Sequence, residues 1–369
     1  MNVSILQENL LRALTRTGRI VPAKAQLPIM QNVLLQSENA KFSVTATSLE
    51  LTEVTTTPAK IESSGGICVS GKLFSDLVVS LPQGAVHLVA KEGSLHVRCG
   101  GVSATIPGLP ASEFPPISPT AKKTGMRIEK SALLAALSGV LFAAATDEGR
   151  PLLTGIKIIK KDGGVVVIAT DGYRLSMKHL DLQEKGDLDI VVPARALAEV
   201  VKVAGEEKDA ASVIMVQNED GQLVFEVGES EIYTRAIAGE YPNIEKIIPK
   251  THNTRILVDT QSLSRAVKSA AVFARDSANI LRFHIENQLL VVSATTPQVG
   301  ENHVEVDAKV DGDGGDIAFN SRFLVEFLSG FSGDEVLFEM TGSLNPGVFK
   351  SPKDESYLHI IMPVRTTSE

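Results

Sequence analysis

The sequence predicts an α+β protein built from three tandem copies of a two-helix, antiparallel-sheet domain. The main observation is a β-rich run that reaches an Ala-Thr pair in three places, at Thr47, Thr170 and Thr295. Thr170 follows Thr47 by 123 residues and precedes Thr295 by 125 residues. A repeated spacing of domain size indicates internal repeats. We therefore expect three domains at residues 1–120, 121–250 and 251–369, named here the first, middle and third repeats.

The first repeat is expected to begin with a helix. Ser4 and Gln7 have the spacing of a capping box, and Gly18 can end the helix. Apolar residues recur at helical intervals in this segment: Leu6, Leu10, Ala13 and Leu14. Strands are expected next, around residues 33–35 and 42–44.

A second helix is expected between Ser70, a suitable cap, and Pro82. Its predicted apolar face consists of Leu73, Phe74, Leu77, Val78 and Leu81. Further strands are expected from Val86 to Ile106.

The middle and third repeats have the same order of patterns. The first helix of the middle repeat has apolar residues at Leu133, Leu134, Leu137 and Leu141, and the second begins at residues 193–197. In the third repeat, Asp259 and Asn320 precede the two predicted helices. The motifs Glu113-Phe114-Pro115 and Glu240-Tyr241-Pro242 close two repeats, and polar segments at residues 116–123 and 249–253 separate the domains.

The composition excludes several classes of protein. A net charge of −8 argues against indiscriminate DNA binding, and 5% aromatic residues with no Trp argue against a stacking platform for single strands. Two cysteines are too few for a disulfide framework. No apolar run is long enough for a membrane span, and the N-terminus has no signal-peptide pattern. We expect a cytoplasmic protein.

Three cations occupy matching places in the repeats. Lys72, Arg195 and Arg322 are separated by 123 and 127 residues, and each falls in the first turn of a predicted helix. A cation there is opposed by the helix dipole by about 0.3–1 kcal/mol, so an external anion such as a phosphate backbone would explain all three. The alternative is an ordinary solvated face. Other cations add positive charge to the opening helices: Arg12, Arg16, Arg19, Arg265 and Lys268.

Other motifs carry little functional signal. Gly66 to Lys72 resembles a phosphate-binding loop, but Leu73 stands where a hydroxyl is needed, so a strand-to-helix turn is expected. The acidic run at residues 311–316 is expected to be a solvated hairpin turn, with a loosely held cation as the alternative. The seven histidines have no metal-ligand spacing. Asp171 is a catalytic candidate only in principle, because Asp-Gly after a strand is typical of a turn.

Several motifs together make the whole chain resemble the bacterial replicative sliding-clamp family, the beta subunits of DNA polymerase III. These motifs are residues 27–32 (LPIMQN), 150–155 (RPLLTG), 169–175 (ATDGYRL), 241–243 (YPN) and 362–365 (MPVR). The resemblance implies a head-to-tail homodimer that closes into a ring of six similar domains around double-stranded DNA, with helices lining the hole. It implies no catalytic residues, no metal and no cofactor.

The resemblance also implies sites for partners. The expected DNA contacts are Lys24, Lys72, Arg150, Arg195 and Arg322. The dimer interface is expected at Ile106, Val272 and Phe273. Short linear peptides of the polymerase III alpha subunit, the clamp loader, other polymerases and repair proteins are expected in a pocket between the second and third domains. Its expected wall is Leu153, Thr170, Gly172, Tyr173, Arg174, Leu175, Pro242, Lys246, Ile247, Ile360, Met362, Pro363, Val364 and Arg365.

The chain departs from the family pattern at Tyr173, where a histidine is common, at Ala104, where an aromatic can occur, and in the tail at residues 366–369. Two other functions remain as alternatives. One is a metal-dependent enzyme acting on DNA, with Asp171 or the acidic run at residues 311–316 as candidates. The other is a repeat-built interaction scaffold with no role on DNA.

Overall fold

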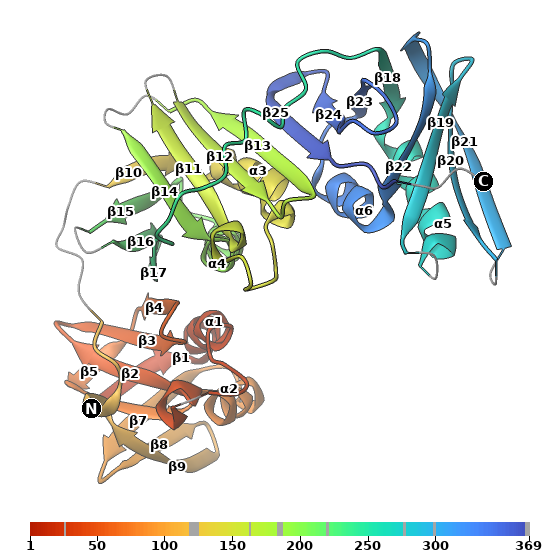
Figure 1. Ribbon diagram of the computed structural model, residues 1–369. Coiled ribbons are helices and arrows are strands. Elements are labelled where there is room, and N and C mark those ends of the chain that lie inside the picture. Colours follow the sequence, from red (N-terminus) through yellow and green to blue (C-terminus); the bar gives the residue numbers. More distant parts are fainter. Residues whose placement is uncertain are drawn as a thin grey trace. The chain divides into compact units, whose positions relative to one another are not determined.

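The computed structural model describes residues 1–25, 27–117, 125–161, 164–182, 187–218, 221–275, 278–297 and 300–365. Most of the predicted boundary at residues 116–123, and the tail after Arg365, lie outside the described residues. Within these ranges, no helix is long and apolar enough to cross a membrane. The three repeats follow one another in the predicted order, and each has two helices (Figure 1).

Each helix begins where the sequence predicts to within a few residues. The bounds are α1 Gln7–Gly18, α2 Gly71–Ser80, α3 Lys130–Val140, α4 Ala194–Glu206, α5 Thr260–Ala274 and α6 Ser321–Gly330. Side chains of Ser70, Asp259 and Asn320 accept hydrogen bonds from backbone N–H groups in the first turns of α2, α5 and α6, at 3.5, 2.7 and 2.9 Å. These caps satisfy N–H groups that have no partner inside the helix, and so define its start.

The strands also repeat in order. In the first repeat they are β1 Asn2–Leu6, β2 Asn32–Glu38, β3 Lys41–Thr47, β4 Thr52–Thr57, β5 Lys60–Ser63, β6 Gly65–Ser70, β7 Ala85–Lys91, β8 Ser94–Cys99 and β9 Val102–Pro110. In the middle repeat they are β10 Met126–Glu129, β11 Gly155–Lys161, β12 Gly164–Thr170, β13 Arg174–Leu180, β14 Leu188–Pro193, β15 Ser212–Gln217, β16 Gln222–Val227 and β17 Ser230–Arg235. In the third they are β18 Thr254–Asp259, β19 Ile280–Glu286, β20 Leu289–Thr296, β21 Gly300–Gly312, β22 Gly315–Asn320, β23 Glu335–Met340, β24 Gly347–Ser351 and β25 Asp354–Ile361.

The chain forms two compact units, and the division between them passes through the middle repeat. Unit 1 holds residues 1–130 and 198–236, and unit 2 holds residues 131–197 and 237–369. Unit 1 contains an antiparallel sheet of 13 strands, in which β10 and β15–β17 of the middle repeat continue the sheet of the first repeat. Unit 2 contains a sheet of 12 strands, in which β11–β14 continue the sheet of the third repeat. The middle repeat therefore contributes one half of its strands to each unit.

The repeats join through two equivalent antiparallel ladders. At the first junction β4 pairs with β17, and Thr52 lies opposite Tyr233. At the second junction β13 pairs with β25, and Leu175 lies opposite Ile360. In both cases the third strand after the first helix of one repeat pairs with the last strand of the next repeat. This rule connects neighbouring repeats by backbone hydrogen bonds.

Three local predictions are wrong. Ser4 lies in β1, paired with β5 and β7, and its hydroxyl contacts His87 Nδ1 at 2.8 Å, so the capping box is absent. Leu6 and Leu73 are exposed and are not part of the buried helix faces. Residues 311–316 do not form a hairpin turn, because β21 and β22 that they connect are not neighbours in the sheet.

Arg16 and Arg19 do not supply a free positive surface, as the sequence suggested. Arg16 is buried in unit 1 and bonds to Glu206 at 3.0 Å and to Glu207 at 2.5 Å. Arg19 forms ion pairs with Glu199 and Glu206. These contacts connect α1 of the first repeat to α4 of the middle repeat, so the two arginines hold the first junction together.

Glu53 brings another buried carboxylate to this junction. It lies on β4 and is 0% exposed, with Thr55 as a weak partner at 3.4 Å. Burial, with the nearby carboxylate of Glu199, raises the pKa of Glu53 to about 7, although Arg19 and Arg16 oppose the shift. The folded chain therefore keeps a proton on Glu53 over a pH range in which the unfolded chain, with an ordinary pKa of 4.5, has lost it.

Glu53→Gln is expected to make stability less sensitive to alkaline pH. Below pH 4.5, the pKa of Glu53 in the unfolded chain, this residue does not reduce the free energy of unfolding. As pH rises toward the folded-state pKa of about 7, the free energy of unfolding falls, because the unfolded chain loses its proton more readily. The substitution should change little near about pH 5 and should raise the free energy of unfolding by up to about 3 kcal/mol near about pH 8. Urea unfolding at both pH values, with exposed Glu38→Gln as the control, measures the difference. An equal effect at the two pH values would contradict the assignment.

Candidate functional site

The turn between β12 and β13 lies at the second junction and is fixed by its own side chains. Thr170 Oγ1 accepts from the Gly172 N–H at 3.0 Å and donates to the Arg174 carbonyl at 2.6 Å. Asp171 Oδ1 accepts from the N–H groups of Tyr173 and Arg174 at 2.8 and 3.0 Å. Asp171 is thus a turn-forming residue, which leaves Tyr173 exposed at the tip.

Gly172 is required by this geometry. Its φ is +90°, and a Cβ atom there would lie 2.7 Å from an Arg150 guanidinium nitrogen. The positive φ disfavours a side chain, and a Cβ atom would also require the end of the Arg150 side chain to move. The Arg150 guanidinium therefore lies directly over the turn.

Arg174 is held within unit 2 by stacking and ion pairs. Its guanidinium carbon lies 4.5 Å from the Phe323 ring centroid and 5.6 Å from that of Phe142. Its nitrogens lie 3.0 Å from Asp171 and 2.5 Å from Glu326. The resemblance suggested that Arg174 meets a bound peptide; here the buried guanidinium links the middle repeat to α6 of the third.

A buried histidine lies behind Arg174. His359 on β25 stacks on Phe327 with centroids 4.8 Å apart, and its Nδ1 contacts the Ser176 hydroxyl at 2.6 Å. Burial, and secondly the charge of Arg174, lower the pKa of His359 to about 3. The imidazole therefore stays neutral in the folded chain and acts as a packing residue.

The structure brings together much of the predicted peptide-binding wall. Leu153, Leu175 and Ile360 are buried in one apolar cluster at the second junction, so they support the wall from below. The Met362 N–H donates to the Tyr173 carbonyl at 2.8 Å, which places Met362 beside the turn. Tyr241, Ile244 and Ile248 pack on the same cluster, and they flank three other wall residues: Pro242, Lys246 and Ile247. Pro363 and Val364 are half-buried, and Arg365 is exposed.

A cavity of about 460 Å³ adjoins Tyr173 and Arg174. Its lining includes Arg150 and Arg322, which the resemblance had placed among DNA contacts. Within the described part of the chain, no ion pair involves either of these two arginines. The sequence did not identify most of this lining as part of a site, including Phe142, Asn320, Phe323 and Glu326. No local pattern could show that the start of α6 lies beside a turn about 150 residues earlier in the chain.

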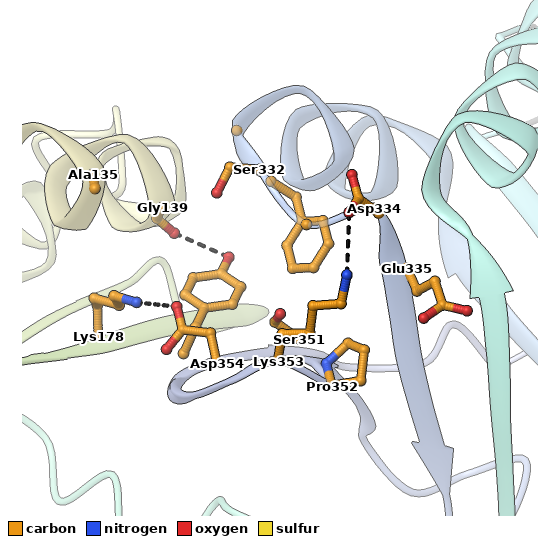
Figure 2. A pocket seen from close by; sticks show the side chains of 14 residues that line it. Ala135, Gly139, Lys178, Ser332, Asp334, Glu335, Ser351, Pro352, Lys353 and Asp354 are labelled. Atoms are coloured by element: carbon orange, nitrogen blue, oxygen red, sulfur yellow. Dashed lines mark hydrogen bonds and ion pairs between the residues drawn. The ribbon is translucent and has the colours of Figure 1, made fainter.

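A second cavity, of about 270 Å³, lies where α3, the end of α6 and the β24–β25 turn meet (Figure 2). Ion pairs join Lys178 to Asp354 and Lys353 to Asp334 across it, and the Tyr357 hydroxyl donates to the Gly139 carbonyl at 3.1 Å. The Lys178–Asp354 and Tyr357–Gly139 contacts connect the middle and third repeats and reinforce the second junction, whereas the Lys353–Asp334 pair lies within the third repeat.

The matched cations are where the sequence predicts them. Lys72, Arg195 and Arg322 are each the second residue of their helices, and all three are exposed. Lys24 is also exposed. The positions and the exposure of these cations therefore agree with a repeated anion-binding role. Arg322 also lines the cavity of about 460 Å³ described above.

Three family models match almost the whole chain. They are the N-terminal, central and C-terminal domains of the DNA polymerase III beta subunit, at residues 1–118, 127–243 and 245–365. Relatives named beta sliding clamp include one from Synechococcus elongatus, 29% identical over 100% of both chains, and one from Staphylococcus aureus, 25% identical over 99% of this chain and 100% of the relative.

This chain belongs to the DNA polymerase III beta subunit family. Solved sliding clamps have the same fold: that of Bacillus subtilis has a TM-score of 0.94 at 23% identity and covers 100% of both chains. The Pseudomonas aeruginosa beta subunit has a TM-score of 0.92 at 26% identity over 99% of this chain and 100% of the other. The family function is that of a DNA sliding clamp, a non-catalytic processivity factor.

The predicted dimer residues of this beta subunit differ in exposure. Val272 on α5 is 55% exposed, and Phe273 packs partly against the core of the third repeat. Ile106 is buried within unit 1, so its backbone on β9 rather than its side chain would be available to a partner. In the described ranges, no group of three or more His, Cys, Asp or Glu side chains could hold a metal ion.

Proposed function

We propose that this chain encircles duplex DNA as a head-to-tail homodimer. It tethers its partners through the predicted peptide-binding wall at the second junction, called here the peptide groove. The observation that carries the ring is the junction rule, in which the third strand after the first helix pairs with the last strand of the next repeat. The rule leaves two strands without a neighbouring repeat to pair with. They are β21, the third strand after the first helix of the third repeat, and β9, the last strand of the first repeat.

Both edges have room for a partner strand. Residues 300–307 of β21 pair only with β20, and residues 102–107 of β9 pair only with β8, among the ladders of the described residues. Exposed strand edges tend to pair with another chain. If β21 of each chain pairs with β9 of the other, the rule continues through six repeats and the ring closes with two identical interfaces.

The charges near the two edges are complementary. Glu301, Glu305 and Asp307 are exposed on β21, and Arg98 is exposed on β8 next to β9. Opposite charges on the two surfaces favour the correct pairing and disfavour the pairing of β21 with a second β21.

A ring explains how an acidic protein can remain on DNA. The repeated cations Lys72, Arg195 and Arg322 would touch phosphates without reading bases, which permits sliding. The protein is then retained because the closed ring surrounds the DNA, and not because it binds the DNA tightly. A chain loaded onto a nicked circle by its loader and ATP should stay on the circle, and it should leave when the circle is cut. Equal retention on circular and linear DNA would contradict the ring.

Charge reversal of Lys72, Arg195 and Arg322 to Glu is expected to weaken contact with DNA and to reduce its salt dependence. Loss of three phosphate contacts per chain, and thus of six per ring, should lower the slope of log affinity against log salt by about 5. Glutamate in the first turn is favoured by the helix dipole, so the fold should not suffer. Salt titrations of binding measure the slope.

The matched control reverses three exposed lysines elsewhere, Lys41, Lys60 and Lys250. An unchanged slope in the first variant, or an equal change in the control, would favour a scaffold with no role on DNA.

We also propose that partners dock as short linear peptides at the second junction. The apolar cluster beneath Leu175 and Ile360 supports a leucine or phenylalanine anchor, and Met362 can adapt to different ligands. The expected partners are the polymerase III alpha subunit, the clamp loader, other polymerases and repair proteins, in the cytoplasm.

A further inference from the structure

The first junction contains a cavity of about 160 Å³ that none of the functions above uses. It lies in unit 1 between the β3–β4 turn, the end of β17 and the segment that follows Phe114. Its lining consists of Thr47, Leu49, Glu50, Thr52, Pro115, Pro116, Ile117, Gln222, Tyr233, Thr234 and Arg235. The volume is below that of usual small-molecule sites, about 300–1,000 Å³, and suits a single side chain.

The repeats make this cavity the counterpart of the proposed peptide groove. Thr52 pairs with Tyr233 as Leu175 pairs with Ile360, so the cavity wall and the groove wall occupy matching places in two ladders. Two residues beyond Tyr233 and Ile360 are Arg235 and Met362. On the opposite wall, the Pro115 segment matches the Pro242 segment, 127 residues later.

The turns that overhang the two sites also match. Thr47 Oγ1 accepts from the Leu49 N–H at 3.1 Å, as Thr170 Oγ1 accepts from the Gly172 N–H at 3.0 Å. Leu49 takes the place of Gly172 and has a φ of +71°, which a leucine rarely adopts. Its side chain is 58% exposed. The chain therefore holds a strained, exposed leucine at a place where the other repeat has glycine.

The chemistry of the two sites differs in a defined way. Arg235 stands in the place of the apolar Met362, and Thr52 in the place of Leu175. A guanidinium has five N–H donors, so Arg235 can bind a ligand carboxylate in addition to partners within the chain. Leu49, Pro116 and Ile117 supply the apolar part of the lining. The first junction thus fits an amphipathic ligand.

We propose that the cavity at the first junction is a second peptide site, which takes an extended segment with a leucine-sized side chain next to a carboxylate. The apolar side chain packs against Leu49 and Ile117, and the carboxylate pairs with Arg235. This inference rests on the proposed function, because it assigns the first junction a ligand of the same class as that of the second.

Methyl resonances of the full-length protein test the site. The probe is the dipeptide N-acetyl-Leu-Asp-N-methylamide at millimolar concentrations, and N-acetyl-Leu-Asn-N-methylamide is its uncharged match. The acidic probe should shift the methyl signals of Leu49 and Ile117 in a saturable manner and bind several-fold more tightly than the amide. Arg235→Glu should weaken it by about tenfold. Leu49→Gly should also weaken it, whereas Leu344→Gly, at another exposed leucine, should not.

A second probe separates this inference from the function on which it rests. A peptide with adjacent leucine and phenylalanine should shift the Met362 methyl signal, and Met362→Ala should weaken that peptide alone. If the acidic dipeptide gives no saturable shift at Leu49, or is insensitive to Arg235→Glu, the second site is wrong while the groove stands. If the Leu-Phe peptide fails at Met362, the groove itself is wrong.

Discussion

Arg19→Met is expected to lower the free energy of unfolding at the first junction by about 3 kcal/mol. Glu199 is buried, and its charge-assisted partner is Arg19, the residue that follows the end of α1. The nearby carboxyl of Glu53 is also buried, and the charge of Glu199 contributes to the raised pKa of Glu53. Without Arg19, the Glu199 carboxylate keeps only Lys202, at 3.5 Å, among its ion pairs in the described residues.

Urea unfolding and hydrogen exchange of the β4–β17 ladder measure this effect at the junction. Glu199→Gln should recover much of the loss in the double variant, because it removes the stranded charge. Arg12→Met is the matched control, since Arg12 is an exposed arginine on α1, and its loss should cost less than about 0.5 kcal/mol. A small loss in Arg19→Met, or no recovery in the double variant, would contradict this role for the ion pair.

The junction networks were not predictable from the sequence for a physical reason. Helix starts at Ser70, Asp259 and Asn320 depend on hydrogen bonds within one turn, so a local pattern identifies them. The partners of Arg16 and Arg19 lie about 180–190 residues away, and nothing local distinguishes these arginines from solvated ones. Their place on and just after an otherwise regular helix therefore suggested free positive charge.

Ser4 illustrates how tertiary pairing overrides a local signal. The capping-box spacing was present, but β1 pairs with a strand on each side, and backbone ladders at both edges outweigh a single side-chain cap. The helix accordingly begins at Gln7 with no side-chain cap.

The resemblance predicted which residues form the candidate groove, but not how their side chains are arranged. The resemblance placed Leu175 and Ile360 in a wall, and the structure shows that both belong to the buried cluster beneath it. The stacking of Arg174 between Phe142 and Phe323 joins three segments that are distant in sequence. Such a contact cannot be predicted from local sequence, because its energy depends on ring positions set by α6 and by the 3-10 helix Leu141–Ala143, and not on neighbours along the chain.

Val272→Asp is expected to convert the dimer to monomers at micromolar concentration. In the proposed ring, Val272 of the third repeat meets the first repeat of the partner, where an unpaired carboxylate costs about 3 kcal/mol per interface. That loss weakens each interface by about two orders of magnitude. The side chain is already exposed within the chain, so the monomer fold should survive, apart from less than about 1 kcal/mol at the end of α5.

Sedimentation and size-exclusion chromatography with light scattering measure the oligomer. Leu344→Asp is the matched control, because Leu344 is 65% exposed and lies outside the proposed interface. The control should remain dimeric. A dimer of unchanged affinity in Val272→Asp would place the interface elsewhere on the chain.

The same variant distinguishes retention by ring closure around DNA from retention by contacts with the duplex. A head-to-tail ring has two identical interfaces, so one substitution per chain weakens both, and a monomer cannot encircle the duplex. Val272→Asp should therefore lose retention on circular DNA although Lys72, Arg195 and Arg322 are intact. The charge-reversed variant should behave in the opposite way: it binds phosphates poorly, but once loaded it still stays on circles and leaves cut DNA. Retention by Val272→Asp monomers would mean that contact with the duplex, and not closure around it, holds the chain on DNA.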